Sequence, residues 1–259
     1  MRHGISYYHI HQDSPSSCKT HRRLNLKSNA TYDILAEEYY EPRHKTSRNF
    51  DSASKRALQS ISLRIPSGLV LDAGSGRGRC GEYLGIESAR VVQLDNSTAM
   101  LSLEPRENAL LRVLHDAEEL PFPDGEFACV AAFLCDPFLG LNFLAEARRV
   151  LSGGGILIGT TPSEQWGRPL RDALGLDPMV TRFVLAGGQV MTAPSAIYSN
   201  KQLHEMLRTV GFRESRININ THTLPDGTDP VSEDIRAPAE TLGLSPYSLG
   251  ILCSFTAEA

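Results

Sequence analysis

The pattern of hydrophobic and polar positions changes near residue 66 of the chain. Before that point, apolar residues recur at helical spacing in two segments, at about residues 31–39 and 52–63. After it, short apolar runs of strand length alternate with amphipathic segments. The runs expected to form strands cover residues 69–71, 90–94, 110–114, 127–134 and 156–160. Strands that alternate with helices indicate βαβ units and a parallel sheet.

The second half of the chain continues this pattern less regularly. A helix is expected over residues 141–151, ended by the triplet Gly153-Gly154-Gly155, and Ser199 with Gln202 forms a capping box that opens another helix. Two final strands are expected at residues 213–221 and 249–256. Segments 162–196 and 225–246 are rich in glycine and proline. Long loops in compact domains are often functional lids, which is our expectation for both segments.

The composition is that of an ordinary soluble protein. The chain has 259 residues, 41% of them hydrophobic, and a net charge of −4, which argues against broad nucleic-acid binding. Its longest uncharged apolar run, residues 127–135, is too short for a membrane helix. The five cysteines form no C-x-x-C pair, which favours reduced thiols and a cytoplasmic location. Residues 1–28 are basic and lack both apolar periodicity and the apolar core of a secretory signal, so we expect a mobile tail.

A glycine-rich turn follows the first expected strand. Residues 70–81 read V-L-D-A-G-S-G-R-G-R-C-G, with four glycines in the last eight positions. Glycines let a ligand approach the backbone, and the N-terminus of the following helix favours negative charge. A turn that only reverses the chain needs one or two glycines, so the sequence predicts a ligand-binding loop.

Two cofactor classes compete for this loop. The spacing Gly76-x-Gly78-x-x-Gly81, with Asp95 further on, matches the dinucleotide fingerprint of nicotinamide dehydrogenases. Beginning at Asp72, the same residues form D-x-G-x-G-x-G. This run resembles motif I of the class I S-adenosylmethionine-dependent methyltransferases, in particular their small-molecule, methyltransferase-11-like members.

Further motifs of that family follow in the family's order. Asp95 ends the second expected strand and Asn96 follows it. Residues 115–122, H-D-A-E-E-L-P-F, resemble the D-A-E-x-L-P-F signature, and residues 145–151 with the glycine triplet resemble E-x-x-R-V-L-x-x-G-G. Tyr32 and Asp33 begin a segment similar to the family's helical cap. The ordered series spans residues 31–161 and favours a methyltransferase over a dehydrogenase.

The resemblance implies a fold, a cofactor and a set of binding residues. The fold would be an α/β, Rossmann-like, doubly wound and mostly parallel sheet of seven strands with a helical N-terminal cap. The cofactor would be S-adenosyl-L-methionine, its methionyl end at the glycine loop, its ribose on Asp95 and its adenine near Asp116. The implied cofactor-binding residues are Asp72, Ala73, Gly74, Ser75, Gly76, Gly78, Asp95, Asn96, Met100, Asp116, Ala117, Glu118 and Phe133.

The same resemblance divides the chain into a basic tail and one methyltransferase domain. The expected parts are the tail at 1–28 and the domain at 29–259, with a cap at 30–65, a cofactor-binding core at 68–161, a lid-like insert at 162–197, and a C-terminal helix and strand pair at 199–257 that includes a loop at 224–247. Lid residues over the substrate would be Tyr32, Tyr40, Arg43 and Trp166. No cluster with metal-ligand spacing stands out.

Candidates for the chemistry lie where the fourth strand ends. The run Asp136-Pro137-Phe138 partly matches the D/N-P-P-Y/F motif of amino-group methyltransferases but lacks its second proline. A structural alternative is that Asp136 caps the next helix and Phe138 packs on the core. His115 departs from the family pattern, and it either binds a ligand or packs beside the adenine pocket. The catalytic candidates are therefore Asp136, His115 and Tyr39.

The function expected from these residues is methyl transfer from S-adenosylmethionine to an oxygen or nitrogen of a small molecule. Such a displacement requires alignment and exclusion of water more than it requires a dedicated catalytic group. Amino-group methylation of nucleic acid or protein, and noncatalytic binding of the cofactor, remain the alternatives. The acidic residues of the later loop argue against a polyanionic substrate, if that loop lies near the pocket.

Overall fold

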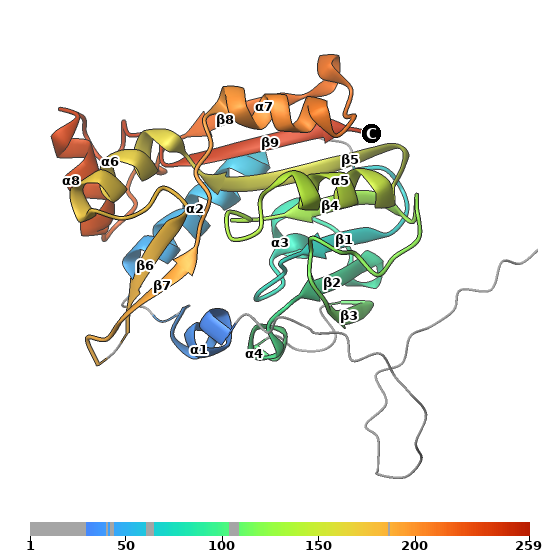
Figure 1. Cartoon of the computed structure of the whole chain (residues 1–259), viewed down its shortest axis with the longest axis horizontal. Helices are drawn as coiled ribbons and strands as arrows, with labels where there is room; N and C mark the ends of the chain where they lie inside the picture. The colour runs from blue at the N-terminus through green and yellow to red at the C-terminus, as the bar shows by residue number, and fades with distance from the viewer. Residues whose placement is uncertain (1–29, 40, 42–43, 61–64, 104–108, 186) are drawn as a thin grey trace, which may run out of the picture.

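The protein folds around one large, mostly parallel β-sheet (Figure 1). A computed structural model describes residues 30–39, 41, 44–60, 65–103, 109–185 and 187–259. The segment expected to be a basic tail lies outside these residues. The strands follow the order β3-β2-β1-β4-β5-β9-β8. They are β1 (Val70–Ala73), β2 (Val91–Asp95), β3 (Leu111–Leu114), β4 (Phe127–Ala132), β5 (Leu151–Pro162), β8 (Asn218–His222) and β9 (Leu252–Glu258).

The pairing confirms the expected fold class. Strands β1 to β5 are parallel neighbours, whereas β9 runs antiparallel to both β5 and β8. Parallel strands require crossover connections, which bring the carboxyl ends of β1, β2 and β4 to the same edge of the sheet. Ligands of open α/β sheets bind at this edge.

Helices cover both faces of the sheet, as its sequence pattern requires. Leu71 and Val130 point into a core formed with α5 and α7, while Val70 and Cys129 point into a second core formed with α2 and α3. Alternate residues of one strand thus face opposite layers, which is why these strands are apolar almost throughout. The helices are α1 (Ala30–Tyr39), α2 (Lys45–Ser60), α3 (Cys80–Leu84), α4 (Thr98–Leu101), α5 (Leu141–Val150), α6 (Glu164–Leu174), α7 (Asn200–Thr209) and α8 (Glu233–Thr241). None of these helices is both long and apolar enough to cross a membrane.

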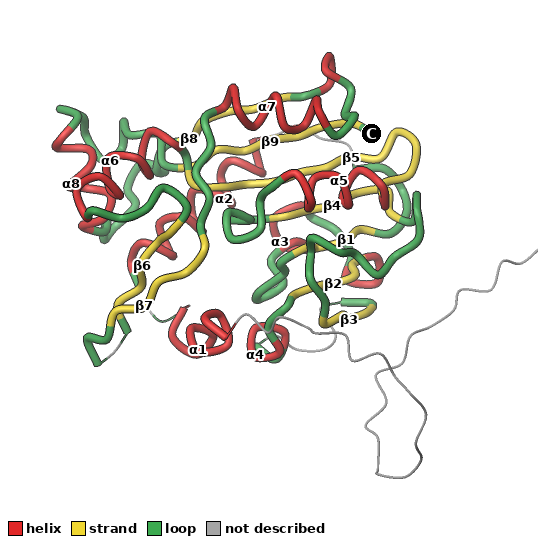
Figure 2. The backbone as a smooth tube through the Cα atoms, in the orientation of Figure 1, coloured by secondary structure: helices red, strands yellow, loops and turns green. Residues whose placement is uncertain are grey.

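The two segments expected to be long loops contain regular structure. Helix α6 is followed by a separate antiparallel hairpin of β6 (Val180–Val184) and β7 (Val190–Pro194), and α8 lies within the later segment. Figure 2 shows α6, α8 and the hairpin grouped at one end of the molecule. A third apolar cluster, which includes Phe50, Trp166 and Ile235, joins α2, α6 and α8 there. The prediction of loops was wrong because an interior proline in each helix, Pro169 and Pro238, reads as a breaker.

The glycine triplet also has a different place from the one expected. Helix α5 ends at Val150, and Leu151 already has extended backbone. The triplet lies within β5, where the register with β4 shifts between the pairs Phe127–Leu151 and Cys129–Ile156. The glycines therefore form a bulge in a strand instead of ending a helix. The capping box at Ser199 is confirmed, with both of its reciprocal hydrogen bonds formed.

The contact between β5 and β9 yields a prediction about stability. A Cβ on Gly159 would lie 2.1 Å from the Phe255 ring, whereas a Cβ on Gly153 would meet nothing within 4 Å. We expect Gly159→Ala to lower the free energy of unfolding by about 1–3 kcal/mol, because the packed core must yield. Urea unfolding measures this, with Gly153→Ala as the control. Adding Phe255→Leu should recover part of the loss, and an equal loss in both glycine variants would contradict the packing explanation.

Candidate functional site

A cavity of about 840 Å³ opens at the carboxyl edge of the sheet. Its wall contains the ends of β1, β2 and β4, together with residues of α1, α2, α6 and the β6–β7 hairpin. Asp72, Asp95 and Asp116, which the sequence places after three different strands, all line this one cavity. The structure therefore brings together the three carboxylates on which the sequence interpretation depends.

The glycine loop forms the floor beside β1. Gly74 and Gly76 have φ angles of 65° and 48°, in the left-handed region that glycine adopts readily. A Cβ on Gly74 would also lie 2.4 Å from the Phe138 ring, so a side chain here would collide with the cavity wall. The loop is closed by the Ser75 N–H, which donates to the Leu94 carbonyl of β2 at 3.0 Å. The bare backbone of these residues thus faces the cavity.

Asp72 lies beneath this loop with only 2% of its surface exposed. Its Oδ2 atom has no hydrogen-bond partner among the described residues. Burial holds the pKa of Asp72 well above its ordinary value; the Cys80 N–H opposes that shift and the Asp95 charge adds to it. An unpartnered buried carboxylate is costly, and a cationic group would offset that cost.

Asp95 is held more firmly at the tip of β2. Its Oδ2 accepts from the Gly76 N–H at 2.8 Å and its Oδ1 from the Ser97 N–H at 2.9 Å. These bonds fix the carboxylate while leaving further lone pairs for a ligand hydroxyl. Burial raises the pKa of Asp95, against the hydrogen bonds from Gly76 and Ser97. The Ser97 hydroxyl donates to Asp33 at 2.5 Å and so ties α1 to this corner.

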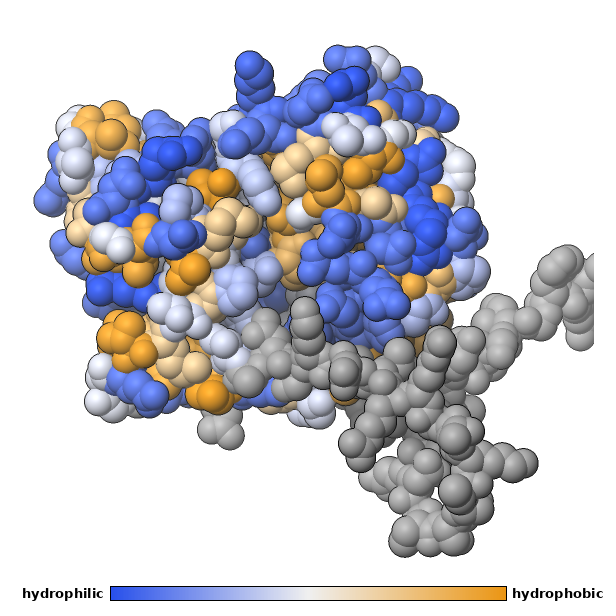
Figure 3. All heavy atoms as spheres, viewed as in Figure 1, coloured by the Kyte–Doolittle hydropathy of each residue, from blue (hydrophilic) through white to orange (hydrophobic). Residues whose placement is uncertain are grey.

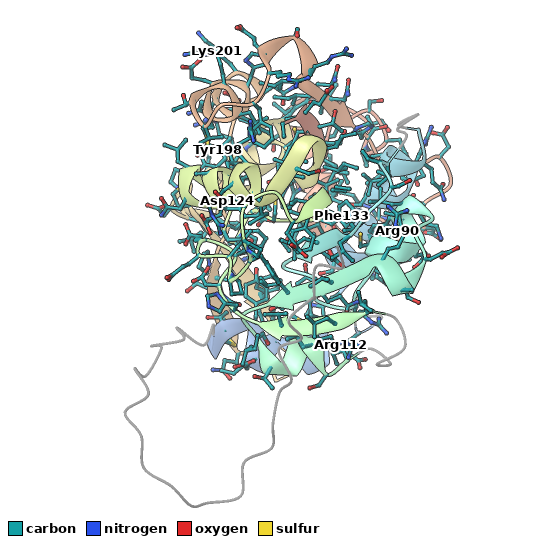
Figure 4. The ribbon with its side chains drawn as sticks, turned by 90° about the vertical axis from the view of Figure 1, so that its right-hand side faces the viewer. Arg90, Arg112, Asp124, Phe133, Tyr198 and Lys201 are labelled. Carbon is teal, nitrogen blue, oxygen red and sulfur yellow. The ribbon has the colours of Figure 1, made fainter. Side chains whose placement is uncertain are left out.

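The third carboxylate, Asp116, follows β3. Its Oδ1 accepts from the Glu118 N–H at 2.9 Å, which fixes its orientation within a turn. Ala117, Met100 and Phe133 provide apolar wall nearby in the cavity lining. Figure 4 shows Phe133 in the middle of the molecule, far from Lys201 and Arg112 at its two ends. The ring of Phe133 packs edge-on against Tyr83, with centroids 5.4 Å apart.

Most of the residues selected from the sequence line this cavity, and four do not. Ala73 is fully buried in β1, and Glu118 is exposed on the turn. Gly78 faces β2, where a Cβ would lie 2.1 Å from Gln93 Nε2, so a side chain would collide there. His115 lies outside the lining, with Nδ1 3.4 Å from the Asp116 carbonyl. The residues that do line it are Tyr32, Tyr39, Asp72, Gly74, Ser75, Gly76, Asp95, Asn96, Met100, Asp116, Ala117, Phe133, Asp136 and Trp166. The two remaining lid candidates, Tyr40 and Arg43, lie outside the described residues.

The orphaned polar atoms of the cavity fit the expected cofactor. Besides Asp72 Oδ2, the buried Ser75 hydroxyl has no partner among the described residues. Asp72 and the glycine loop have the charge and the exposed backbone to receive an ammonium and a carboxylate, the two groups of a methionyl end. Asp95 has the acceptor capacity for ribose hydroxyls. Ala117, Met100 and Phe133 offer an apolar slot to a nucleobase.

The other half of the cavity surrounds the end of β4. Leu134 has a φ of 51°, which is rare for a non-glycine residue, and its N–H donates to the Thr160 hydroxyl at 3.0 Å. Such strain is characteristic of functional sites, and it directs the chain so that Asp136 lines the cavity. Asp136 does not cap the next helix, because the N-cap of α5 is Gly140. Phe138 does pack on the core, edge-on to Phe143 at 4.9 Å.

Asp136 has buried partners from the insert. It accepts a hydrogen bond from the Ser195 side chain, and its carbonyl accepts from the Ala196 N–H at 2.8 Å. Burial raises the pKa of Asp136 to about 6, although Ser195 and the charge of Arg171 lower it. Sequence reasoning missed Ser195 and the strained Leu134, and no local pattern around either residue signals a role.

The cover of the cavity comes from two distant parts of the chain. The Tyr39 ring of α1 packs against Phe183 of the hairpin, with centroids 5.8 Å apart. On the other side, Trp166 of α6 packs edge-on against Phe50 of α2 at 4.8 Å. The Trp166 Nε1–H donates to the Asp234 carbonyl at 2.8 Å. These contacts place aromatic rings over the half of the cavity that surrounds the end of β4. We call this half the acceptor half.

Comparison with known proteins agrees with this geometry. A family model described as a methyltransferase domain matches residues 71–159, the segment from β1 into β5. A relative from Mycolicibacterium smegmatis, named a probable S-adenosylmethionine-dependent methyltransferase, is 28% identical over 193 residues. That match covers 73% of this chain and 65% of the relative, so the chain spans less than two thirds of that protein. A relative of the same description from Mycobacterium tuberculosis is 26% identical over 213 residues, 76% of this chain and 74% of its own.

Solved structures share the fold. A methyltransferase of Thermotoga maritima, described as a possible histamine N-methyltransferase, superposes with a TM-score of 0.59 at 19% identity, covering 88% of this chain and 98% of its own. A Haloferax volcanii methyltransferase in complex with its Trm112 activator gives a TM-score of 0.64 at 16% identity, covering 90% and 97%. At these identities the likeness concerns the fold.

Fold and site together define a Rossmann-like domain with a large cavity at the carboxyl edge of its sheet. The matched methyltransferase domain and the named relatives make the chain similar to S-adenosylmethionine-dependent methyltransferases, whose fold it shares.

The role of Asp95 can be tested by cofactor binding. We expect Asp95→Ala to weaken S-adenosylhomocysteine binding at least about tenfold, because ribose hydroxyls would lose a buried acceptor. Isothermal titration calorimetry measures the dissociation constant. Asp124→Ala is the matched control, since Asp124 is exposed and its carboxylate pairs with Arg149 outside the cavity. Equal affinity in the Asp95 variant and the wild type would exclude the ribose role.

Asp72 yields a prediction about protons. Its pKa is raised in the free protein, so a nearby ligand ammonium should lower it and release protons on binding. Affinity for S-adenosylhomocysteine should then rise with pH through the raised pKa and level off above it. Calorimetry in buffers of different ionisation enthalpy counts the protons. Asp72→Asn should reduce the release without lowering the thermal midpoint of the free protein, and proton uptake by the wild type would contradict the assignment.

Proposed function

We propose that the protein transfers a methyl group from S-adenosylmethionine to a hydroxyl or amino group of a small, largely apolar molecule. The observation that carries this proposal is the character of the acceptor half of the cavity, where one buried carboxylate, Asp136, lies among large apolar side chains. Those side chains are Phe50, Leu134, Trp166, Leu170, Leu174, Leu176, Phe183, Val184 and Leu185. An apolar pocket with few polar groups is typical of small-molecule sites.

The surface near the cavity supports an apolar acceptor. Val184 and Val190 of the hairpin are 48% and 56% exposed. Figure 3 shows hydrophobic surface over the hairpin. An apolar molecule would therefore contact hydrophobic side chains both on the hairpin surface and in the acceptor half of the cavity. The charges of the wall do not decide the substrate class, because Glu233 and Asp234 line the cavity together with Lys45 and Arg48.

The chain's own part in the reaction would be alignment, exclusion of water and proton acceptance. S-adenosylmethionine supplies an activated methyl group on a sulfonium. Asp72, Asp95 and Asp116 would hold it in one orientation, and the aromatic cover of Tyr39 and Trp166 would exclude water. Asp136 would bind the hydrogen of the acceptor's O–H or N–H group and direct its lone pair toward the methyl.

The division of labour between segments belongs to the same proposal. Helix α1, α6 and the hairpin would act as the cover, and residues 68–161 as the cofactor-binding core. A reducing, cytoplasmic location is also part of it, supported by the buried free thiols of Cys80, Cys129, Cys135 and Cys253.

The acceptor class can be tested with labelled cofactor. Purified protein and S-adenosyl-[methyl-³H]methionine are incubated with panels of apolar phenols, alcohols and amines, and separately with RNA, DNA and protein fractions. We expect label in a small molecule. Trp166→Ala and Phe183→Ala should raise the KM for that acceptor several-fold and leave S-adenosylhomocysteine affinity unchanged. Label confined to a macromolecular fraction would overturn the small-molecule proposal, and tight cofactor binding without turnover on any panel would favour a noncatalytic binder.

A further inference from the structure

Three buried polar residues from different segments meet at the base of the acceptor half. Arg171 of α6 is 4% exposed, Ser195, directly after β7, is 3% exposed, and Asp136, after β4, is 9% exposed. Arg171 Nη2 donates to the Ser195 hydroxyl at 2.7 Å and to the Ser195 carbonyl at 2.8 Å. Its Nε donates to the Val180 carbonyl at 2.9 Å. The guanidinium is thus anchored to β6 and to the residue that follows β7.

The direction of these hydrogen bonds is fixed by chemistry. A guanidinium can only donate, so the Ser195 oxygen accepts from Arg171 and its own hydrogen is free to point elsewhere. The remaining partner is the Asp136 carboxylate, which accepts from Ser195. The hydrogen bond from Arg171 therefore orients the Ser195 hydroxyl so that it donates to the Asp136 carboxylate. The Ala196 N–H, bonded to the Asp136 carbonyl at 2.8 Å, holds the backbone of both residues in place.

We propose that Ser195, oriented by Arg171, is a positioning residue that turns the Asp136 carboxylate toward the acceptor and keeps it ionised as the proton acceptor of methyl transfer. The inference rests on the proposed function and deepens it, because it requires a methyl acceptor that loses a proton during the reaction. The acceptor class is accordingly an alcohol, a phenol or a neutral primary or secondary amine, in which the nucleophilic atom carries both a lone pair and a hydrogen.

The charged surroundings of Asp136 are consistent with this role. Among the described residues, Arg171 is the cation whose charge acts on Asp136, and Asp177, which follows α6 in the sequence, acts on Arg171. The adjacent Cys135 thiol and, beyond it, Cys253 of β9 are buried, and burial raises the pKa of both thiols, so they remain neutral. Arg171 Nη1 has no partner among the described residues although it is buried. An acceptor atom of a bound molecule at the cavity wall would satisfy this donor.

The proton balance of the step is simple. The acceptor oxygen or nitrogen forms a bond to the methyl carbon as the carbon–sulfur bond breaks, and the electron pair of that bond goes to sulfur. The acceptor's hydrogen passes to an Asp136 carboxylate oxygen. The products are the methylated acceptor, S-adenosylhomocysteine and a protonated Asp136, which returns its proton to water. A carboxylate of raised pKa is a better base than an exposed one and is still ionised at neutral pH.

The experiment follows the ionisation of Asp136 directly. Protein labelled with ¹³C in the aspartate carboxyl groups is titrated by NMR in the presence of S-adenosylhomocysteine, and Asp136→Asn identifies the Asp136 signal. We expect the pKa to be near 6 in the wild type, higher in Ser195→Ala and in Arg171→Gln, and restored in Ser195→Thr. Thr192→Ala, at an exposed position on β7, the strand that precedes Ser195, is the matched control and should leave the pKa of Asp136 unchanged.

Activity provides a second measurement with the acceptor found by the labelled-cofactor panels. Ser195→Ala should lower kcat roughly tenfold or more and move the acidic limb of its pH profile upward, while the KM for S-adenosylmethionine stays unchanged. Ser195→Thr should recover most of kcat. If Ser195→Ala folds and the Asp136 signal titrates as in the wild type, the inference is overturned whether or not an acceptor is known. Failure of the wild-type protein to bind S-adenosylhomocysteine would instead contradict the proposed function.

Discussion

The whole site depends on carboxylates that are buried at one edge of a sheet without full compensation by the protein. Desolvation raises the pKa of Asp72, Asp95 and Asp136 together. Such groups cost free energy in the folded chain and gain the most from a ligand that brings positive charge or hydrogen-bond donors. A sulfonium nucleoside with an ammonium group offers both. Binding of such a ligand would therefore offset part of the free-energy cost of burying these carboxylates.

The parallel sheet brings these carboxylates to one edge of the fold. Because β1, β2 and β4 run in the same direction, the residues that follow them meet without any long-range contact between their side chains. Backbone N–H groups of the glycine loop and of Ser97 then fix Asp95, and the Ser97 hydroxyl brings in α1 through Asp33. One short corner of the chain thus positions a carboxylate and also attaches part of the cover.

The sequence predicted the parts of the molecule whose chemistry is local. The loop from Asp72 to Gly76 could be interpreted because strand, acidic residue and glycines are neighbours in the chain, and the alternation of strands and helices gave the fold class. Gly78, expected as a binding residue, packs closely on β2 and lies outside the cavity lining, and the triplet at residues 153–155 does not end a helix. A glycine required for close packing or for a bulge has the same letter as one required for a ligand.

What the sequence did not reveal depends on contacts between distant segments. Arg171 and Ser195 are 24 positions apart, and no spacing rule relates either of them to Asp136. The left-handed backbone of Leu134 also could not be predicted from the local sequence, because it is stabilised by a hydrogen bond to Thr160 on the neighbouring strand. The helices of the two inserts were not predicted because each contains a proline. Packing in the apolar cluster around Trp166 stabilises these helices despite the prolines. Tertiary packing overrides local preference at each of these points.

The insert that covers the acceptor half also supplies the partners of Asp136. Trp166 and Phe183 shape the pocket, while Arg171 and Ser195, from the same segment, set the orientation and charge of the carboxylate at its base. A change in this segment would therefore alter which molecule fits and how strongly its proton is attracted at the same time. The cofactor half contains none of these residues. On this proposal, pocket shape and base strength both depend on the insert, whereas holding the methyl donor depends on the core.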